Sequence, residues 1–221
     1  MKPAISSLPA DWIANRLNPG QRAVGWFIPS GYEAYVRIMH PLVLVTEVSS
    51  MRVKWRDVAV ANGSSLEELL MSLSLSGEPP RERPSGEDLW STTSDNGTLT
   101  LELASTLLTV LEKHTETLDK CWFAVWDGWT GMIKPETAPP VFRIPWRELL
   151  LFEGQMKDIL YLFAPDRYQS ANLWWPDDRR WCVSTDIDFN WTYVGATQTC
   201  IDDFLANSPF EAYQITTSTV K

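Results

Sequence analysis

The sequence predicts an α+β fold, with a mostly antiparallel sheet and helices packed on it, in a single domain. Strand-like and helix-like segments are mixed along the 221 residues without a regular β-α-β rhythm. The links between the later strands are too short for the crossover helices that parallel strands need. Hydrophobic residues make up 44% of the chain and charged residues 21%, as in ordinary globular domains. We therefore expect one domain over 1–221, with a sizeable buried core.

The first forty residues predict one short helix and two strands. A helix over 8–17 would place Trp12, Ile13 and Leu17 on one side. Strands are expected over 22–28 and 32–40. In the second of these strands, alternate side chains would face opposite sides of the sheet.

The next segment predicts helices and then a long break. Residues 55–61 suit one or two helical turns, and Ser64 followed by Glu67 matches a capping box that opens a helix through Leu75. The break at 76–97 is rich in proline, glycine and charged residues. Loops of this length are usually functional or serve as linkers, so we expect 76–97 to be mobile.

The second half predicts a helix followed by several strands. Over 98–114, leucines recur at helical spacing, and CWFAVWDGW at 121–129 is typical of a buried strand that ends in a turn. Further strands are expected near 141–144, 147–153 and 157–163. The C-terminal part predicts strands at 181–189 and 191–195, then a helix that begins at Thr197 with Ile201, Phe204 and Leu205 inside, and last an edge strand over 210–217.

The charge balance limits the partners of the protein. Nineteen basic residues face 28 acidic ones, which gives a formal net charge of −9. Nucleic acid and anionic membranes repel such a chain, so we expect no nucleic-acid partner and no membrane association. The sequence has no signal peptide and no apolar stretch of membrane-spanning length. Three widely spaced cysteines indicate reduced, buried thiols rather than disulfides or a zinc site, and these features favour a cytoplasmic location.

The common catalytic and nucleotide-binding motifs are absent. The sequence has no GxxxxGK[ST], GxGxxG, GxSxG or HExxH. The only histidines are His40, at an expected strand end, and His114, at an expected helix end. Both suit structural roles, and each cysteine lies in an apolar run. We therefore name no catalytic residue and no cofactor.

One segment, SANLWWPDDRRWCVSTDIDFNWTYV at 170–194, stands out in a chain with 12 tryptophans. A tight cluster of opposite charges lies between tryptophans there, and Pro176 favours a turn that leads into a strand. Trp and Arg often carry interface energy. The candidate binding residues are Trp174, Trp175, Asp177, Asp178, Arg179 and Arg180.

The same segment contains a possible metal site. If 181–189 is a strand, Asp186, Asp188 and Asn190 share one face. An EF-hand is excluded, because Trp191 and Thr197 stand where that loop needs glycine and glutamate. Two carboxylates on one strand face repel each other unless a cation or an arginine compensates them. We favour compensation by Arg179 or Arg180, and Asp186 and Asp188 remain the candidate ligands of a divalent cation.

Three blocks carry a resemblance to other proteins. GYEAYVRIMHP at 31–41, CWFAVWDGW at 121–129 and LWWPDDRRWCVSTDIDFNWTYVG at 173–195 together resemble a set of uncharacterised bacterial proteins with the same blocks in the same order. That resemblance implies no activity. The architecture is also similar to the SUKH superfamily of bacterial immunity proteins, which implies an acidic cytoplasmic α+β domain that binds and neutralises a toxin.

These observations favour a non-catalytic domain that binds a protein partner rather than an enzyme, and the SUKH resemblance implies an immunity-like role for it. The alternative is a metal-dependent hydrolase that uses Asp177, Asp178, Asp186 and Asp188 around a divalent cation. A carbohydrate- or small-ligand-binding module is the third reading, because indole rings beside carboxylates and guanidinium groups suit sugar hydroxyls. Convergent carboxylates would favour the enzyme, whereas carboxylates paired with arginines beside an aromatic surface would favour the binding protein.

Overall fold

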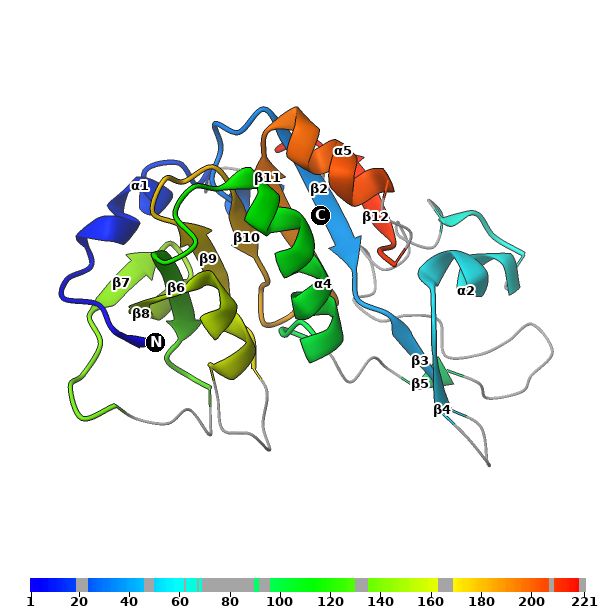
Figure 1. Ribbon diagram of the computed structural model, residues 1–221. Coiled ribbons are helices and arrows are strands. Elements are labelled where there is room, and N and C mark those ends of the chain that lie inside the picture. The colour runs from blue at the N-terminus through cyan, green and yellow to red at the C-terminus, as the bar shows by residue number, and fades with distance from the viewer. Residues whose placement is uncertain are drawn as a thin grey trace.

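The structure is a computed structural model that describes most of the chain. The described residues are 1–18, 24–45, 50–61, 63–66, 68, 90–91, 96–129, 135–162, 169–206 and 209–218. In this part of the chain, nine strands form one sheet and three strands form a second, and every strand pair is antiparallel (Figure 1). Helices pack on the large sheet, so the predicted α+β class is confirmed.

The large sheet mixes strands from both ends of the chain. In sheet order, its strands are β1 (Lys2–Pro3), β8 (Arg147–Gly154), β6 (Cys121–Trp126), β9 (Leu173–Pro176), β10 (Cys182–Ser184), β11 (Trp191–Ala196), β2 (Ala34–Met39) and β12 (Ala212–Ile215), and β7 (Val141–Ile144) also pairs with β8. The small sheet has the order β4 (Ser50–Val53), β3 (Leu42–Val45) and β5 (Trp90–Ser91). Figure 1 shows that β2 leads almost directly into β3, which carries the chain out to the small sheet.

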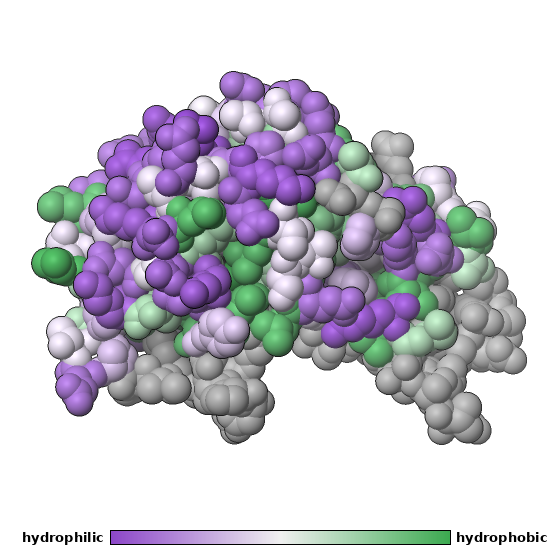
Figure 2. All heavy atoms as spheres, in the orientation of Figure 1, coloured by the Kyte–Doolittle hydropathy of each residue, from purple (hydrophilic) through white to green (hydrophobic). Residues whose placement is uncertain are grey.

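Helical segments lie on both sides of the large sheet. They are η1 (Leu8–Ala10), α1 (Asp11–Ala14), η2 (Val24–Trp26), α2 (Trp55–Ala61), α4 (Leu101–Leu111), η3 (Glu112–His114), η4 (Met156–Tyr161) and α5 (Gln198–Ala206). Side by side, α4 and α5 cover one face of the sheet (Figure 1). Figure 2 shows this side as mostly hydrophilic, with a hydrophobic strip beside α4.

The period-two alternation of the strands builds a core on each face. Trp174 and Val183 point into the cluster beneath α4 and α5, whereas their neighbours Trp175 and Cys182 point into a cluster against α1. A third cluster, around Trp55 of α2, lies on the same face as the α1 cluster but at the other end of the sheet. The central strands are therefore covered on both faces, and every side chain of β2, β9, β10 and β11 is buried.

The predicted helix over 98–114 is confirmed as α4 and the turn η3 that continues it. The Thr100 hydroxyl accepts a hydrogen bond from the Leu103 amide at 3.0 Å and so caps the helix. Leu103, Leu107 and Leu111 are buried at successive turns, because residues three or four apart share one helix face.

Several other predicted elements are also confirmed. Strands occur at 34–39, 121–126, 141–144, 147–154 and 191–196, helices at 55–61 and 198–206, and an edge strand at 212–215. The predicted N-terminal helix is shorter than expected, since η1 and α1 end at Ala14. The hydroxyl of Thr197 accepts from the Cys200 amide at 3.3 Å, but Leu205 is exposed rather than inside.

Two predicted strands are wrong for local reasons. Within the expected strand 22–28, residues 24–26 form the turn η2, and 22–23 lie outside the described residues. The expected strand 157–163 is the 3₁₀ segment η4. There Gln155 and Asp158 form a reciprocal capping box, which satisfies the first amides of a helical turn.

The predicted strand 181–189 is wrong after Ser184. The Asp186 carboxylate accepts a hydrogen bond from the Asp188 amide at 3.1 Å, and the Phe189 amide donates to the Asp186 carbonyl at 3.1 Å. An aspartate that bonds to nearby amides favours a turn over a strand. Residues 185–190 therefore form the turn between β10 and β11.

The predicted loop 76–97 is only partly described. Trp90–Ser91 form β5, residues 96–97 form a turn, and 76–89 and 92–95 lie outside the described residues. The reciprocal capping bonds join Ser65 and Glu68, at 2.8 and 3.2 Å, rather than Ser64 and Glu67. Glu67 and the rest of the expected helix to Leu75 also lie outside the described residues.

Candidate functional site

The two adjacent tryptophans of β9 are core residues. Both Trp174 and Trp175 are 0% exposed. Trp174 packs against Trp181 with ring centres 5.1 Å apart, on the α4 side of the sheet. Trp175 packs against Trp12 at 5.9 Å on the other side. These rings support the turn that follows them but lie out of reach of a partner at the surface.

The turn after β9 presents its charged residues at the surface. The Arg179 amide donates to the Pro176 carbonyl at 2.9 Å and closes the turn. Asp177, Arg179 and Arg180 are exposed, and Asp178 is partly exposed. Trp175 is therefore buried beneath a turn whose charged side chains reach the surface.

Both aspartates of this turn bind other parts of the same chain. Asp177 accepts hydrogen bonds from the Trp122 indole at 2.9 Å and from Lys120 at 3.1 Å. Burial raises the pKa of Asp177, but these two hydrogen bonds outweigh it, so the pKa lies below its usual value. Asp178 accepts from the Thr115 hydroxyl at 2.8 Å and the Glu116 amide at 2.9 Å.

The two arginines of this turn differ in their partners. Arg180 forms a 2.6 Å ion pair with Glu116 and lies 3.7 Å from Asp178. Arg179 adopts a left-handed backbone conformation, with φ of 56°, and its guanidinium lies 5.5 Å from the centre of the Trp12 ring. Among the six predicted binding residues, Arg179 is therefore an exposed charge that forms no ion pair with a carboxylate of the described residues, although it helps to lower the pKa of Asp177.

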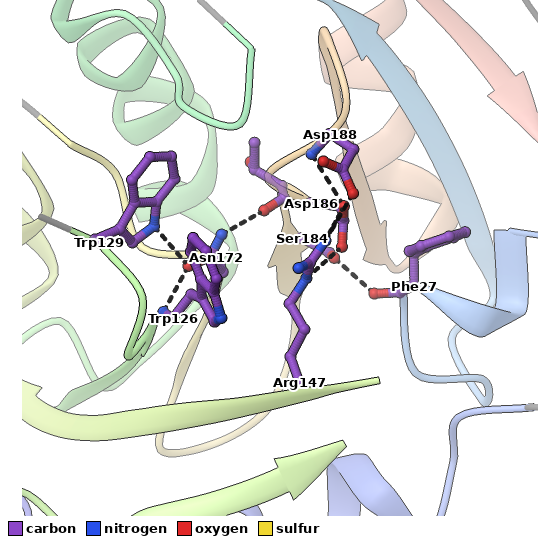
Figure 3. Close-up of polar contacts among 9 residues, drawn as sticks. Phe27, Trp126, Trp129, Arg147, Asn172, Ser184, Asp186 and Asp188 are labelled. Atoms are coloured by element: carbon purple, nitrogen blue, oxygen red, sulfur yellow. Dashed lines mark hydrogen bonds and ion pairs between the residues drawn. The ribbon is translucent and has the colours of Figure 1, made fainter. Parts of the chain in front are cut away.

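Asp186 and Asp188 are compensated by an arginine, but not by the expected one. Arg147 at the start of β8 reaches Asp186 through Nε at 3.2 Å and Nη2 at 2.9 Å, and its Nη2 also lies 2.9 Å from Asp188 (Figure 3). Arg179 and Arg180 lie at the opposite end of the β9–β10 hairpin. Burial opposes the charge on Arg147, but the bonds to Asp186 and Asp188 raise the pKa of the guanidinium.

The four aspartates do not converge on one point. Asp177 and Asp178 follow β9 at one end of the hairpin, whereas Asp186 and Asp188 follow β10 at the other end. Within the described ranges, no group of three or more His, Cys, Asp or Glu side chains could hold a metal ion. The four carboxylates are therefore bonded within the chain and separated into two groups.

Four partly exposed tryptophans form two contacting pairs, one of them beside Arg147, and we call them the tryptophan rim: Trp26, Trp126, Trp129 and Trp146. The Arg147 guanidinium lies 5.5 Å from the centre of the Trp126 ring. Trp126 and Trp129 contact edge to face at 5.7 Å, as do Trp26 and Trp146 at 5.0 Å. Arg147 therefore lies against one pair of indole rings and directly follows Trp146 of the other pair.

Buried polar contacts fix the base of this rim. The Asn172 side-chain oxygen accepts from the Trp126 amide at 2.8 Å and from the Trp129 indole at 3.3 Å, and its nitrogen donates to the Thr185 carbonyl at 3.0 Å (Figure 3). The Ser184 hydroxyl donates to the Phe27 carbonyl at 2.6 Å. A cavity of about 20 Å³ lies beneath Arg147, enough for one water molecule. The hydrogen bonds of Asn172 and Ser184 therefore hold the base of the rim in one arrangement before any partner binds.

The remaining nucleophile and base candidates are inaccessible or paired. His40 is fully buried and lies 2.9 Å from the Thr192 hydroxyl, and His114 pairs with Asp203 at 2.8 Å. Cys121, Cys182 and Cys200 are buried and form no disulfide. Burial raises the pKa of each thiol, to about 12 for Cys121 and Cys200, so thiolate chemistry is disfavoured.

Sequence reasoning missed the tryptophan rim and Arg147. The rim is assembled from three separate segments, and only the pairing of β6 with β8 brings Trp126 next to Arg147. One signal was present in the sequence: Trp126 and Trp129 flank an Asp-Gly turn, and Trp146 precedes Arg147 in another turn. Large aromatic residues at turns often lie partly exposed.

No family model, curated protein or solved structure matches the chain. Among the residues that the structure describes, no helix combines the length and apolar character needed to cross a membrane.

Proposed function

We propose that this protein is a non-catalytic domain that binds a protein partner through the tryptophan rim. The observation that carries the proposal is the presence of four partly exposed indole rings in two contacting pairs, one of them against Arg147, with the exposed Asp188 bound to that arginine. Tryptophan and arginine are the residue types that most often dominate interface energy. Because Asn172 and Asp186 hold the base of the rim in place, binding would require little ordering of side chains.

The carboxylates also support binding rather than catalysis. Asp186 and Asp188 share Arg147, Asp177 is held by Lys120, and Asp178 is held by backbone and hydroxyl donors. A general base or metal ligand needs a carboxylate that is free to act on a substrate. These four are already used within the fold.

The net charge of −9 supports a partner that is neither nucleic acid nor an anionic membrane. Three free, buried thiols fit a reducing compartment, which supports a cytoplasmic location. An acidic cytoplasmic binding domain is also consistent with an immunity-like role, in which the partner would be a toxin. That finer assignment rests on the architectural analogy.

Affinity capture with matched variants tests the proposal. The wild-type protein and the Trp129→Ala, Trp146→Ala and Tyr161→Ala variants are immobilised and exposed to lysate from the native host, and bound proteins are quantified by mass spectrometry. Tyr161 is the control, because it is an exposed aromatic residue on η4, outside the rim. We expect one protein to be retained by the wild type and by Tyr161→Ala but lost from both tryptophan variants. Equal retention by all four folded proteins would contradict the proposal.

A carbohydrate-binding role is the second candidate, since partly exposed indole rings near the Arg147–Asp188 ion pair also suit sugar hydroxyls. A glycan array tests it with the same variants. Binding of a glycan by the wild type that Trp129→Ala abolishes, without capture of any protein, would replace the protein partner by a sugar.

A further inference from the structure

Two arginines from distant parts of the chain lie against one tryptophan. The Arg16 guanidinium is 5.6 Å from the centre of the Trp12 ring, and the Arg179 guanidinium is 5.5 Å from the same centre. Arg16 follows Trp12 by one helical turn at the end of α1, whereas Arg179 comes from the turn between β9 and β10. The fold therefore places two positive charges against the same indole ring, on a chain with a net charge of −9.

Neither arginine has a carboxylate partner among the described residues. The nearest acids in sequence to Arg179 are Asp177 and Asp178, and both point to other partners. Asp177 binds Lys120 and Trp122, and Asp178 binds Thr115 and the Glu116 amide. The adjacent Arg180, in contrast, has its own acid in Glu116. Neither guanidinium at Trp12 is therefore held in an ion pair, although the charge of Arg179 also helps to lower the pKa of the neighbouring Asp177 carboxyl.

Two hydrogen-bond donors beside the arginines also lack partners. Trp12 is 8% exposed, and its indole nitrogen is buried without a hydrogen bond, as is the hydroxyl of Tyr32. The Trp12 and Tyr32 rings meet edge to face at 6.5 Å. Burial raises the pKa of Tyr32, and the charges of Arg16 and Arg179 oppose that rise, so both guanidiniums act on this hydroxyl. Buried donors without partners are uncommon in folded proteins.

The backbone is shaped to accommodate this cluster. Gly31 has a φ of +102°, and a Cβ atom there would lie 3.2 Å from Nη1 of Arg16, so glycine lets the guanidinium lie against the chain next to Tyr32. Arg179 holds a left-handed conformation that is unfavourable for a residue with a side chain. Strained residues are often found at functional sites.

We propose that Arg16, Arg179 and the Tyr32 hydroxyl form a binding site for a doubly charged oxyanion of the phosphate monoester class. Two guanidinium groups without acids match a dianion in charge, and a phosphate offers several acceptor oxygens to their N–H groups and to the hydroxyl. The site is separate from the tryptophan rim and does not depend on the proposed function.

Thermal unfolding with inorganic phosphate as the probe tests the site, with chloride at matched ionic strength as the reference. For the wild type we expect a rise in Tm of about 3–6 °C at a tenfold excess over the dissociation constant. Because phosphate also stabilises proteins by exclusion from their surfaces, the wild-type rise is compared with that of variants. Arg16→Gln and Arg179→Gly are expected to lose the specific part of the rise, whereas Arg180→Gln is expected to keep it.

Arg179→Gly separates binding from folding. Glycine relieves the left-handed strain, so this variant is expected to melt no lower than the wild type without phosphate and still to lose the phosphate response. O-phosphoserine should bind as phosphate does, and acetate and succinate should not. An equal phosphate response in Arg179→Gly and Arg180→Gln would overturn the proposal. An equal response of the wild type to succinate would overturn the phosphate class.

Discussion

Arg147 and Asp186 form a two-point ion pair that ties β8 to the turn after β10, with Nε–Oδ2 at 3.2 Å and Nη2–Oδ1 at 2.9 Å. The side chains are 16% and 7% exposed. The second aspartate, Asp188, shares the same Nη2 but is 73% exposed. Arg147 thus has one buried partner and one solvated partner, and the two ion pairs should contribute differently to the free energy of unfolding.

Asp186→Asn is expected to lower the free energy of unfolding by about 3 kcal/mol, because it leaves a partly buried guanidinium without its main partner. Asp188→Asn is its matched control and should change stability by less than about 0.5 kcal/mol, since an exposed ion pair contributes little. Denaturant unfolding measures both. Equal losses of unfolding free energy in the two variants would show that the buried ion pair stabilises the fold no more than the exposed one.

Calcium and magnesium are expected to leave Tm unchanged, because Arg147 already pairs with both Asp186 and Asp188 and occupies the place that a cation would take. A specific cation present at a hundredfold excess over its dissociation constant would add about 2.7 kcal/mol of stability. Thermal unfolding with each cation, against sodium at equal ionic strength, makes the comparison. A clear rise in Tm that Asp188→Asn removes would restore the metal-dependent hydrolase as the leading alternative.

The lowered pKa of Asp177 predicts that the stability difference between the wild type and Asp177→Asn depends on pH. Its pKa in the folded protein is below the usual 3.8, so the charged carboxylate stabilises the fold above the unfolded pKa, and this contribution is lost as pH falls through the folded pKa. Asp177→Asn should therefore be less stable than the wild type at neutral pH, and the gap should close in acid. Glu136→Gln, at an exposed position, is the control. A gap that stays constant down to pH of about 2 would contradict the assignment.

We expect that Arg37 can be replaced by an apolar residue without destabilising the fold. It is 7% exposed, lies 5.0 Å from the Trp191 ring centre and 5.6 Å from that of Tyr193, and forms no ion pair within the described part of the chain. Its Nε has no hydrogen-bond partner. Removing a buried charge that lacks an acid is often neutral or stabilising, so Arg37→Met should unfold at the same or higher denaturant concentration. A loss above about 2 kcal/mol would contradict this.

The sequence was most informative where local pattern and tertiary packing agree. Alternation predicted the strand around Val36, and leucine spacing together with a threonine cap predicted α4. Prediction failed where side chains bond to the backbone. The Gln155–Asp158 capping box turns an apolar run into η4, and the Asp186 carboxylate ends β10 early.

The candidate site was harder to predict because its members are far apart in sequence. Arg147 precedes its partner Asp186 by 39 residues, and nothing in the local pattern shows which of several arginines reaches that carboxylate. The position of β8 in the sheet determines that Arg147 is the arginine that reaches Asp186, and the register of β8 against β6 also places Trp126 beside Arg147. The exposure of Arg179, in contrast, can be predicted from the local sequence, since a charged turn after a buried strand faces solvent.

The affinity of a captured partner for matched variants tests the central claim most directly. If the tryptophan rim is the binding surface, calorimetric titration should show that Trp129→Ala weakens binding by about 30-fold, which corresponds to a loss of about 2 kcal/mol. Tyr161→Ala, outside the rim, should bind within about twofold of the wild type. Indistinguishable dissociation constants for the wild type and Trp129→Ala would contradict the account.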